Sequence, residues 1–141
     1  VLDLDRFKLV NDMHGHAAGD AVLAEIAARL AASLPEAALL ARLGGEEFLA
    51  ILPDCPMPAA RRIAEDMRRA VMSAPVRLPD GSGQAELGVT TSAGVAVLSA
   101  AEAASAPPDA EALLARADHA LLAAKSSGRN RIVMAPLSMA A

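Results

Sequence analysis

The sequence has almost no aromatic residues. Phenylalanine occurs only at Phe7 and Phe48 among the 141 residues, and tryptophan and tyrosine are absent. A domain that binds single-stranded nucleic acid stacks the bases on aromatic side chains. This class of protein is therefore nearly excluded. The core must be built from aliphatic residues and from alanine, which makes up about a quarter of the chain.

Cysteine, positive charge and long apolar runs are also scarce. The single cysteine, Cys55, excludes an internal disulfide and favours a reducing compartment. The formal net charge of -4 provides no basic field that would attract nucleic acid or an anionic membrane. No apolar run approaches the roughly 20 residues that span a bilayer, and the first residues do not show the basic-then-apolar pattern of a signal peptide. We therefore expect a cytoplasmic domain without direct membrane or nucleic-acid contact.

The spacing of apolar residues predicts alternating strands and helices. Helices are expected over residues 19–34, 58–73 and 109–126, and strands over 1–5, 86–98 and 131–135. A hairpin is expected over 39–52 with its turn at Gly44-Gly45, a loop or irregular hairpin tip over 75–84, a linker over 100–108 and a frayed tail over 136–141. This order predicts an α/β fold of the α+β sandwich type, in which helices flank a central, mostly antiparallel sheet.

Three acidic residues are candidate metal ligands. Asp3 lies in the first strand, and Glu46 and Glu47 follow the paired glycines. If the hairpin lies beside the first strand, the three carboxylates converge at one end of the sheet. Carboxylate oxygens suit Mg²⁺, which commonly takes one or two protein carboxylates together with substrate phosphates. The alternative is that each residue is an ordinary surface charge at a strand end.

Asn11 and Asp20 are candidates for recognition of a guanine base. A side-chain amide can donate to the O6 atom of guanine while a carboxylate accepts from its N1 and N2 hydrogens. Alternatively, Asn11 begins a turn and Asp20 is an acid in the first helical turn, which the helix dipole favours. Local chemistry alone favours this second interpretation.

Lys125 and Arg129 are candidate phosphate ligands, because a lysine and an arginine together can hold the outer phosphates of a triphosphate. Alternatively, both cations only stabilise the negative end of a helix dipole. His14 and His16 invite a zinc hypothesis, but no cysteine or third histidine stands near them in sequence to complete a tetrahedral site. His16 is more plausibly a residue that shapes the loop.

Five collinear segments resemble the GGDEF family of diguanylate cyclases and cover nearly all of the chain. They are Asp3–Asp12, which matches D-x-D-x-F-K-x-x-N-D; Gly15-His16 with Gly19-Asp20, which matches G-H-x-x-G-D; Arg42 with Gly44–Phe48, the signature itself; Val89–Ala96; and Ala117–Leu121 with Ala124-Lys125 and Gly128–Asn130. The resemblance implies a nucleotidyltransferase that condenses two GTP molecules into cyclic di-GMP (c-di-GMP) and releases two pyrophosphates.

The resemblance also implies a role for particular residues. It implies two Mg²⁺ ions per active site, with Mn²⁺ as a substitute, bound by Asp3, Glu46 and the Leu4 carbonyl, with Glu47 assisting the second ion. The expected catalytic residues are Asp3, Glu46 and Glu47. The expected substrate-binding residues are Asn11 and Asp20 for guanine, Lys125, Arg129 and the backbone near Arg6 and Phe7 for the triphosphate, and Lys8, His16, Gly44 and Gly45. Each domain binds one GTP, so turnover needs a homodimer.

Three departures from the family pattern modify these expectations. The inhibitory R-x-x-D motif of the family aligns with Pro35 and Ala38, so we predict no product inhibition at that place. Leu122 replaces a tyrosine that is usual in the family. The opening helix and the D-x-L-T-G-L-x-N-R segment would precede Val1, so residues 1–141 are expected to be one GGDEF domain without its first helix. The parent is expected to carry an N-terminal sensory or dimerisation domain.

Two other functions compete with the cyclase. One is a catalytically silent module that binds GTP and regulates a neighbouring domain, and the other is a purely structural interaction domain. Degenerate members of the family typically lose the carboxylates of the signature, whereas Gly44–Phe48 retains them here. The sequence therefore favours the enzyme.

Overall fold

The computed structural model describes residues 1–79, 85–105 and 109–137. Its helices are α1 (Phe7–His14), α2 (His16–Ser33), α3 (Met57–Val71), α4 (Ala100–Ser105) and α5 (Ala110–Ser126). Its strands are β1 (Leu2–Leu4), β2 (Leu39–Gly44), β3 (Glu47–Ile51), β4 (Val76–Arg77), β5 (Glu86–Leu87), β6 (Thr91–Val95) and β7 (Ile132–Met134).

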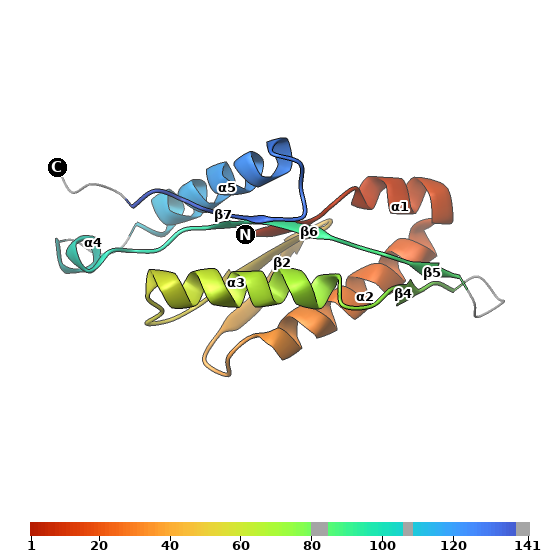
Figure 1. The fold of residues 1–141 in the computed structure, drawn as a ribbon, viewed down its shortest axis with the longest axis horizontal. Helices are drawn as coiled ribbons and strands as arrows, with labels where there is room; N and C mark the ends of the chain where they lie inside the picture. The colour runs from red at the N-terminus through yellow and green to blue at the C-terminus, as the bar shows by residue number, and fades with distance from the viewer. Residues whose placement is uncertain (80–84, 106–108, 138–141) are drawn as a thin grey trace.

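A five-stranded sheet in the order β2-β3-β1-β6-β7 forms the centre of the molecule (Figure 1). All its neighbouring strands are antiparallel except β6 and β7, which are parallel. Strands β4 and β5 pair separately as a short antiparallel ladder. The expected mixed fold with a mostly antiparallel sheet is confirmed.

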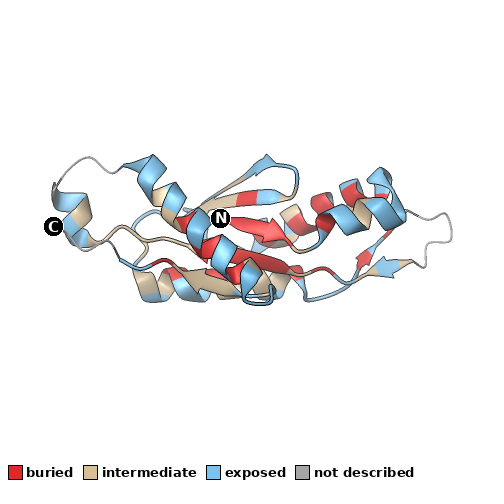
Figure 2. Cartoon of the chain, turned by 90° about the horizontal axis from the view of Figure 1, so that it is seen from above, coloured by how far each residue is buried: buried red, intermediate tan, exposed pale blue. Residues whose placement is uncertain are grey.

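Helices cover both faces of this sheet, with α5 on one side and α2 and α3 on the other (Figure 1). Successive side chains of a strand point to opposite faces. Leu2 and Leu4 of β1 accordingly lie in the main core beside α2 and α3, whereas Asp3 between them is directed to the α5 face. Figure 2 shows buried residues along the central strands and on parts of the helices. Polar side chains can therefore gather on the α5 face without interrupting the main core.

Helix α5 lies very close to β6 because of a glycine. A Cβ atom on Gly94 would collide with backbone atoms of Ala117 and Leu121 in α5. The helix begins as the sequence predicts, because the Asp109 side chain accepts a hydrogen bond from the Ala112 amide at 3.1 Å. The close approach brings the last turn of α5, with Lys125, over the end of β1.

The sequence analysis did not predict helix α1. Its N-cap residue is Arg6, which has φ 58 and makes no side-chain cap, so the usual signal of a helix start is missing. Gly15, with φ 83, separates α1 from α2, and α2 begins at His16, three residues before the expected start. The segment Arg6–Asp20 is therefore helical over most of its length.

The β2–β3 hairpin is confirmed, but its turn is displaced by one residue. Strand β2 continues through Gly44, and the turn consists of Gly45 and Glu46. The register shifts between Arg42 and Gly44, which accommodates the extra residue. Gly44 and Gly45 have φ 151 and 49, which are conformations that favour glycine.

Two further segments differ from expectation. The strand expected over 86–98 is divided into β5 and β6, because residues 88–90 lie outside both ladders. The expected linker contains helix α4, which starts at a capping box in which Ser99 and Glu102 exchange hydrogen bonds of 2.7 and 3.1 Å. Residues 80–84, 106–108 and 138–141, including part of the expected tail, lie outside the described residues.

No helix within the described ranges combines the length and the apolar character needed to cross a membrane.

Candidate functional site

The acidic part of the candidate site lies at the end of β1. Strand β1 pairs with β3 so that Asp3 is opposite Glu47, and the Leu4 amide donates to the Glu46 carbonyl at 3.2 Å. Side chains of directly opposite residues lie on the same face with Cβ atoms about 5 Å apart. The structure therefore brings the three acidic residues of the sequence analysis to one place, as expected if the hairpin lies beside the first strand.

Asp3 is the buried member of this group. Its side chain is 9% exposed, and Lys125 of α5 binds its Oδ2 through an ion pair of 2.8 Å. Burial raises the pKa of the Asp3 carboxyl above its usual 3.8, the Lys125 ammonium opposes the rise, and Glu46 and Glu47 add to it. Lys125 pairs with Asp3, and among the described residues no ion pair involves Glu46 or Glu47, so the negative charge is incompletely compensated.

The donor set fits a hard divalent cation. It consists of carboxylates beside backbone carbonyls, and all of these are oxygen ligands. Across the described part of the chain, no three aspartate, glutamate, histidine or cysteine side chains are grouped closely enough to hold a metal ion by themselves. Such an open set is compatible with Mg²⁺ that arrives with substrate phosphates and keeps several waters. The metal roles of Asp3, Leu4, Glu46 and Glu47 stay predictions.

A cleft of about 310 Å³ lies between α1 and the turn that follows α5. Two arginines line it, Arg6 before α1 and Arg129 in the turn, together with apolar residues of α1 such as Leu9 and Met13. Within the described part of the chain, the Arg129 guanidinium makes no hydrogen bond or ion pair with the protein, and the side chain is exposed. Arg129 is therefore available to an anionic ligand at this cleft, while Lys125 is held by Asp3.

Asn11 of α1 and Asp20 of α2 lie outside this cleft. A Cβ on Gly19 would collide with the Asn11 Oδ1 atom, so this glycine allows the Asn11 side chain to lie directly against α2. Asp20 is the next residue and is exposed. Neither residue lines the cleft beside Arg129. Asn11 thus lies against the residue that precedes Asp20, and the role of both residues in binding guanine stays a prediction.

The other expected substrate-binding residues differ in burial. Phe7 is buried in the main core, whereas Lys8, His16, Gly44 and Gly45 are exposed. Phe7 thus anchors α1 through its side chain and can contribute only its backbone to a ligand. The roles of all five residues stay predictions.

Asp5 is a site residue to which the sequence analysis gave no role. Its carboxylate accepts hydrogen bonds of 2.7 Å from the Thr90 and Ser92 hydroxyls and of 3.0 Å from the Asn130 amide. It therefore joins β1 to β6 and to the turn that carries Arg129. The D-x-D pattern contained a signal for this residue, because alternate residues of a strand share a face.

Comparison with known proteins identifies the family. The model of the family described as diguanylate cyclase, GGDEF domain, matches residues 1–131. The diguanylate cyclase DgcP of Pseudomonas aeruginosa is 42% identical over 135 residues, which is 96% of this chain. The chain belongs to the GGDEF domain family of diguanylate cyclases.

Solved structures agree with this assignment. Diguanylate cyclase SiaD of P. aeruginosa, in complex with its activator SiaC, has a TM-score of 0.84 and 40% identity over 95% of this chain and 48% of its own. The GGDEF domain of DgcB from Caulobacter crescentus, in complex with c-di-GMP, has a TM-score of 0.84 and 32% identity over 95% of this chain and 74% of its own. The chain spans only 19% of the length of DgcP.

Proposed function

We propose that this chain is the catalytic domain of a diguanylate cyclase that condenses two molecules of GTP into c-di-GMP and releases two pyrophosphates. The main support is the pairing of Asp3 with Glu47 across β1 and β3, with Lys125 bound to Asp3. This pairing supports a metal-binding role for the acidic residues and a phosphate-binding role for Lys125. Membership of the diguanylate cyclase family supports the same activity.

The acidic residues hold the cations in this proposal. Asp3, Glu46 and the Leu4 carbonyl bind Mg²⁺, and Glu47 assists a second ion, with Mn²⁺ as a substitute. When bound, the ions lower the pKa of the ribose 3′-hydroxyl and neutralise charge on the α-phosphate and the leaving pyrophosphate. Asp3 is held in place by burial and by Lys125, so its oxygen is positioned before the substrate arrives.

The remaining residues hold the nucleotide. Asn11 donates to the O6 atom of guanine and Asp20 accepts from N1 and N2, a combination that adenine cannot satisfy. Arg129, Lys125 and the backbone near Phe7 hold the triphosphate. Lys125 is shared between Asp3 and the phosphates, which couples the acidic part of the site to the substrate.

A second copy of the domain completes the reaction. Each domain binds one GTP, so the 3′-hydroxyl of one nucleotide attacks the α-phosphate of the other across a dimer. We propose that a sensory or dimerisation module attached to the N-terminus brings the two domains together in the cytoplasm, where GTP is available. Pro35 and Ala38 carry no charge that could bind a cyclic dinucleotide, so the product does not inhibit at that place.

Product chromatography of the full-length protein tests this proposal. With GTP and Mg²⁺, we expect c-di-GMP and pyrophosphate in a ratio of one to two, no product when a chelator removes the metal, and no turnover of ATP. A dimeric protein that binds GTP with Mg²⁺ and leaves it unchanged would contradict the proposal and would indicate a silent regulatory module.

A further inference from the structure

The turn between α5 and β7 has an unfavourable backbone conformation. Gly128, Arg129 and Asn130 have φ values of 111, 62 and 46 in succession. Residues with a Cβ atom rarely adopt positive φ, although asparagine tolerates it better than most. Arg129 and Asn130 are both held in this region, together with Arg6 across the cleft, and such residues keep their conformation only when their surroundings fix it.

Two contacts fix this turn, one from the last part of α5 and one from Asp5, directly after β1. The Arg129 amide donates to the Ala124 carbonyl at 3.1 Å, and the Asn130 amide donates to Asp5 Oδ2 at 3.0 Å. Asp5 is itself held by the Thr90 and Ser92 hydroxyls. These contacts fix the backbone on both sides of the Arg129 Cα atom.

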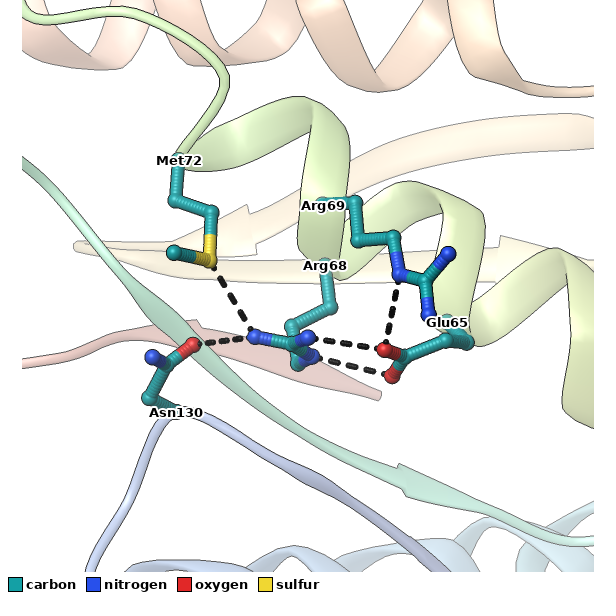
Figure 3. Close-up of polar contacts among 5 residues, drawn as sticks. All are labelled: Glu65, Arg68, Arg69, Met72 and Asn130. Atoms are coloured by element: carbon teal, nitrogen blue, oxygen red, sulfur yellow. Dashed lines mark hydrogen bonds and ion pairs between the residues drawn. The ribbon is translucent and has the colours of Figure 1, made fainter.

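Arg68 of α3 fixes the turn from the opposite side. Its Nη1 donates to the Asn130 Oδ1 at 2.6 Å, and it also contacts the Met72 sulfur (Figure 3). Glu65 accepts two hydrogen bonds from the same guanidinium, at 2.9 Å from Nε and 2.7 Å from Nη2. The Arg68 side chain is 16% exposed and therefore has little freedom. A rigid ion pair on α3 thus holds the side chain of Asn130.

Arg129 lies between these two sets of contacts, and its guanidinium is directed to no protein partner that the structure of the described residues records. Arg68 does not line the cleft beside Arg129. Any effect of Arg68 on a ligand in the cleft must pass through Asn130 and the turn.

We propose that Arg68 is a positioning residue for the GTP phosphates: by holding Asn130, it keeps the Gly128–Asn130 turn in the conformation that presents Arg129 to the ligand. The proposal rests on the proposed function, because it takes Arg129 as a phosphate ligand. A turn released from Arg68 can relax toward negative φ, and binding must then restore the presented conformation. The affinity for GTP falls accordingly.

Arg69 provides a matched control. It lies next to Arg68 on the same helix and also donates to Glu65, at 3.1 Å, but it is 70% exposed and has no contact with Asn130. Arg68→Ala and Arg69→Ala therefore both remove a partner of Glu65, and only the first releases the turn. Asn130→Gly removes the same contact with Arg68 without imposing strain, because glycine tolerates positive φ, and it serves if Arg68→Ala does not fold.

A double-mutant cycle in the full-length protein tests the proposal. The ligand is Mg²⁺ with α,β-methylene GTP, whose α–β bond cannot be cleaved, and its dissociation constant is measured by calorimetry. We expect Arg68→Ala and Asn130→Gly to weaken binding about tenfold and Arg69→Ala to change it less than about twofold. In an Arg129→Ala background, Arg68→Ala should have no further effect, because the group that it positions is absent. With GTP, the KM should rise more than kcat falls.

Three results would overturn the proposal. The first is that Arg68→Ala weakens binding equally with and without Arg129. The second is that Asn130→Gly leaves the affinity unchanged. The third is that Arg69→Ala weakens binding as much as Arg68→Ala does. In each case, c-di-GMP synthesis by the wild type would show that the proposed function stands while the positioning role fails. A wild-type protein that neither binds the analogue nor makes product would contradict both the positioning role and the proposed function.

Discussion

The turn at Gly128–Asn130 and the tip of the β2–β3 hairpin both contribute to the candidate site, but protein contacts fix them to different degrees. Asp5, directly after β1, and Arg68 of α3 hold the turn through Asn130. The tip is fixed by its strand ladder and by a hydrogen bond of 2.9 Å from Arg42 Nε to the Gly45 carbonyl, and Glu47 is exposed. The turn that carries the proposed phosphate ligand Arg129 is thus fixed by protein contacts, whereas in the proposed function the carboxylates at the hairpin are joined by a cation.

The largest expected effect is the loss of cyclase activity on substitution of a hairpin glutamate. Glu47→Gln removes a negative ligand and should reduce c-di-GMP synthesis by about a thousandfold, because charge stabilisation by a bound metal contributes several kcal/mol. The midpoint of urea unfolding should change little, since Glu47 is exposed. The exposed acid Glu36, changed to Gln, is the control and should retain activity. Synthesis retained in Glu47→Gln would refute the role given to this residue.

The turn should show the opposite pattern, with a large effect on stability. Asp5→Ala leaves two hydroxyls and the Asn130 amide without their acceptor, and it should lower the free energy of unfolding by about 2–4 kcal/mol. Urea unfolding of the variant and the wild type measures this difference. A loss below about 1 kcal/mol would mean that water replaces the carboxylate and that the turn is not fixed from β1.

A substitution beside Asn11, the proposed guanine ligand, should lower stability, as one at the turn does, and should also weaken binding. Gly19→Ala gains about 1 kcal/mol of helix propensity but places a Cβ against Asn11 Oδ1, and overpacking costs about 1–3 kcal/mol. We expect a net loss of stability together with weaker GTP binding. Ala28→Gly, at an exposed position of the same helix, is the control for a change in helix propensity alone. Unchanged GTP affinity in Gly19→Ala would contradict the role of Asn11 in base recognition.

Acid should weaken the α3 side of the turn selectively. The hydrogen bonds from Arg68 lower the pKa of the Glu65 carboxyl from 4.5 to about 2. The resulting stabilisation is fully present above pH 4.5 and is lost as the pH falls toward about 2. The difference in urea midpoint between the wild type and Glu65→Gln should therefore be largest at neutral pH and should narrow through this range. A difference that does not depend on pH would contradict the ion pair.

The smallest expected effect is at the hairpin tip. Arg42→Ala removes an exposed hydrogen bond to the Gly45 carbonyl and should change the free energy of unfolding by no more than about 0.5–1 kcal/mol. The same urea titration measures it beside Asp5→Ala. A loss as large as that of Asp5→Ala would remove the contrast between the two parts of the site.

The sequence predicted the mixed sheet, helices α3 and α5 and the β2–β3 hairpin, because apolar periodicity and the Asp109 cap are local signals. Helix α1 escaped prediction because Arg6 has no side chain that caps a helix, and α4 escaped because its alanine-rich segment resembled a linker. The acidic group followed from the resemblance to a family and from the expected strand pairing. The contact between Arg68 and Asn130 joins residues 62 positions apart and leaves no local pattern.

A crystal structure of the full-length protein with Mg²⁺ and the uncleavable GTP analogue tests the account most directly. We expect the ion on Asp3 and the hairpin glutamates, phosphate oxygens on Lys125 and Arg129, guanine between Asn11 and Asp20, and an unmoved Gly128–Asn130 turn. A nucleotide bound elsewhere, or an ion that does not contact Asp3, would contradict the account.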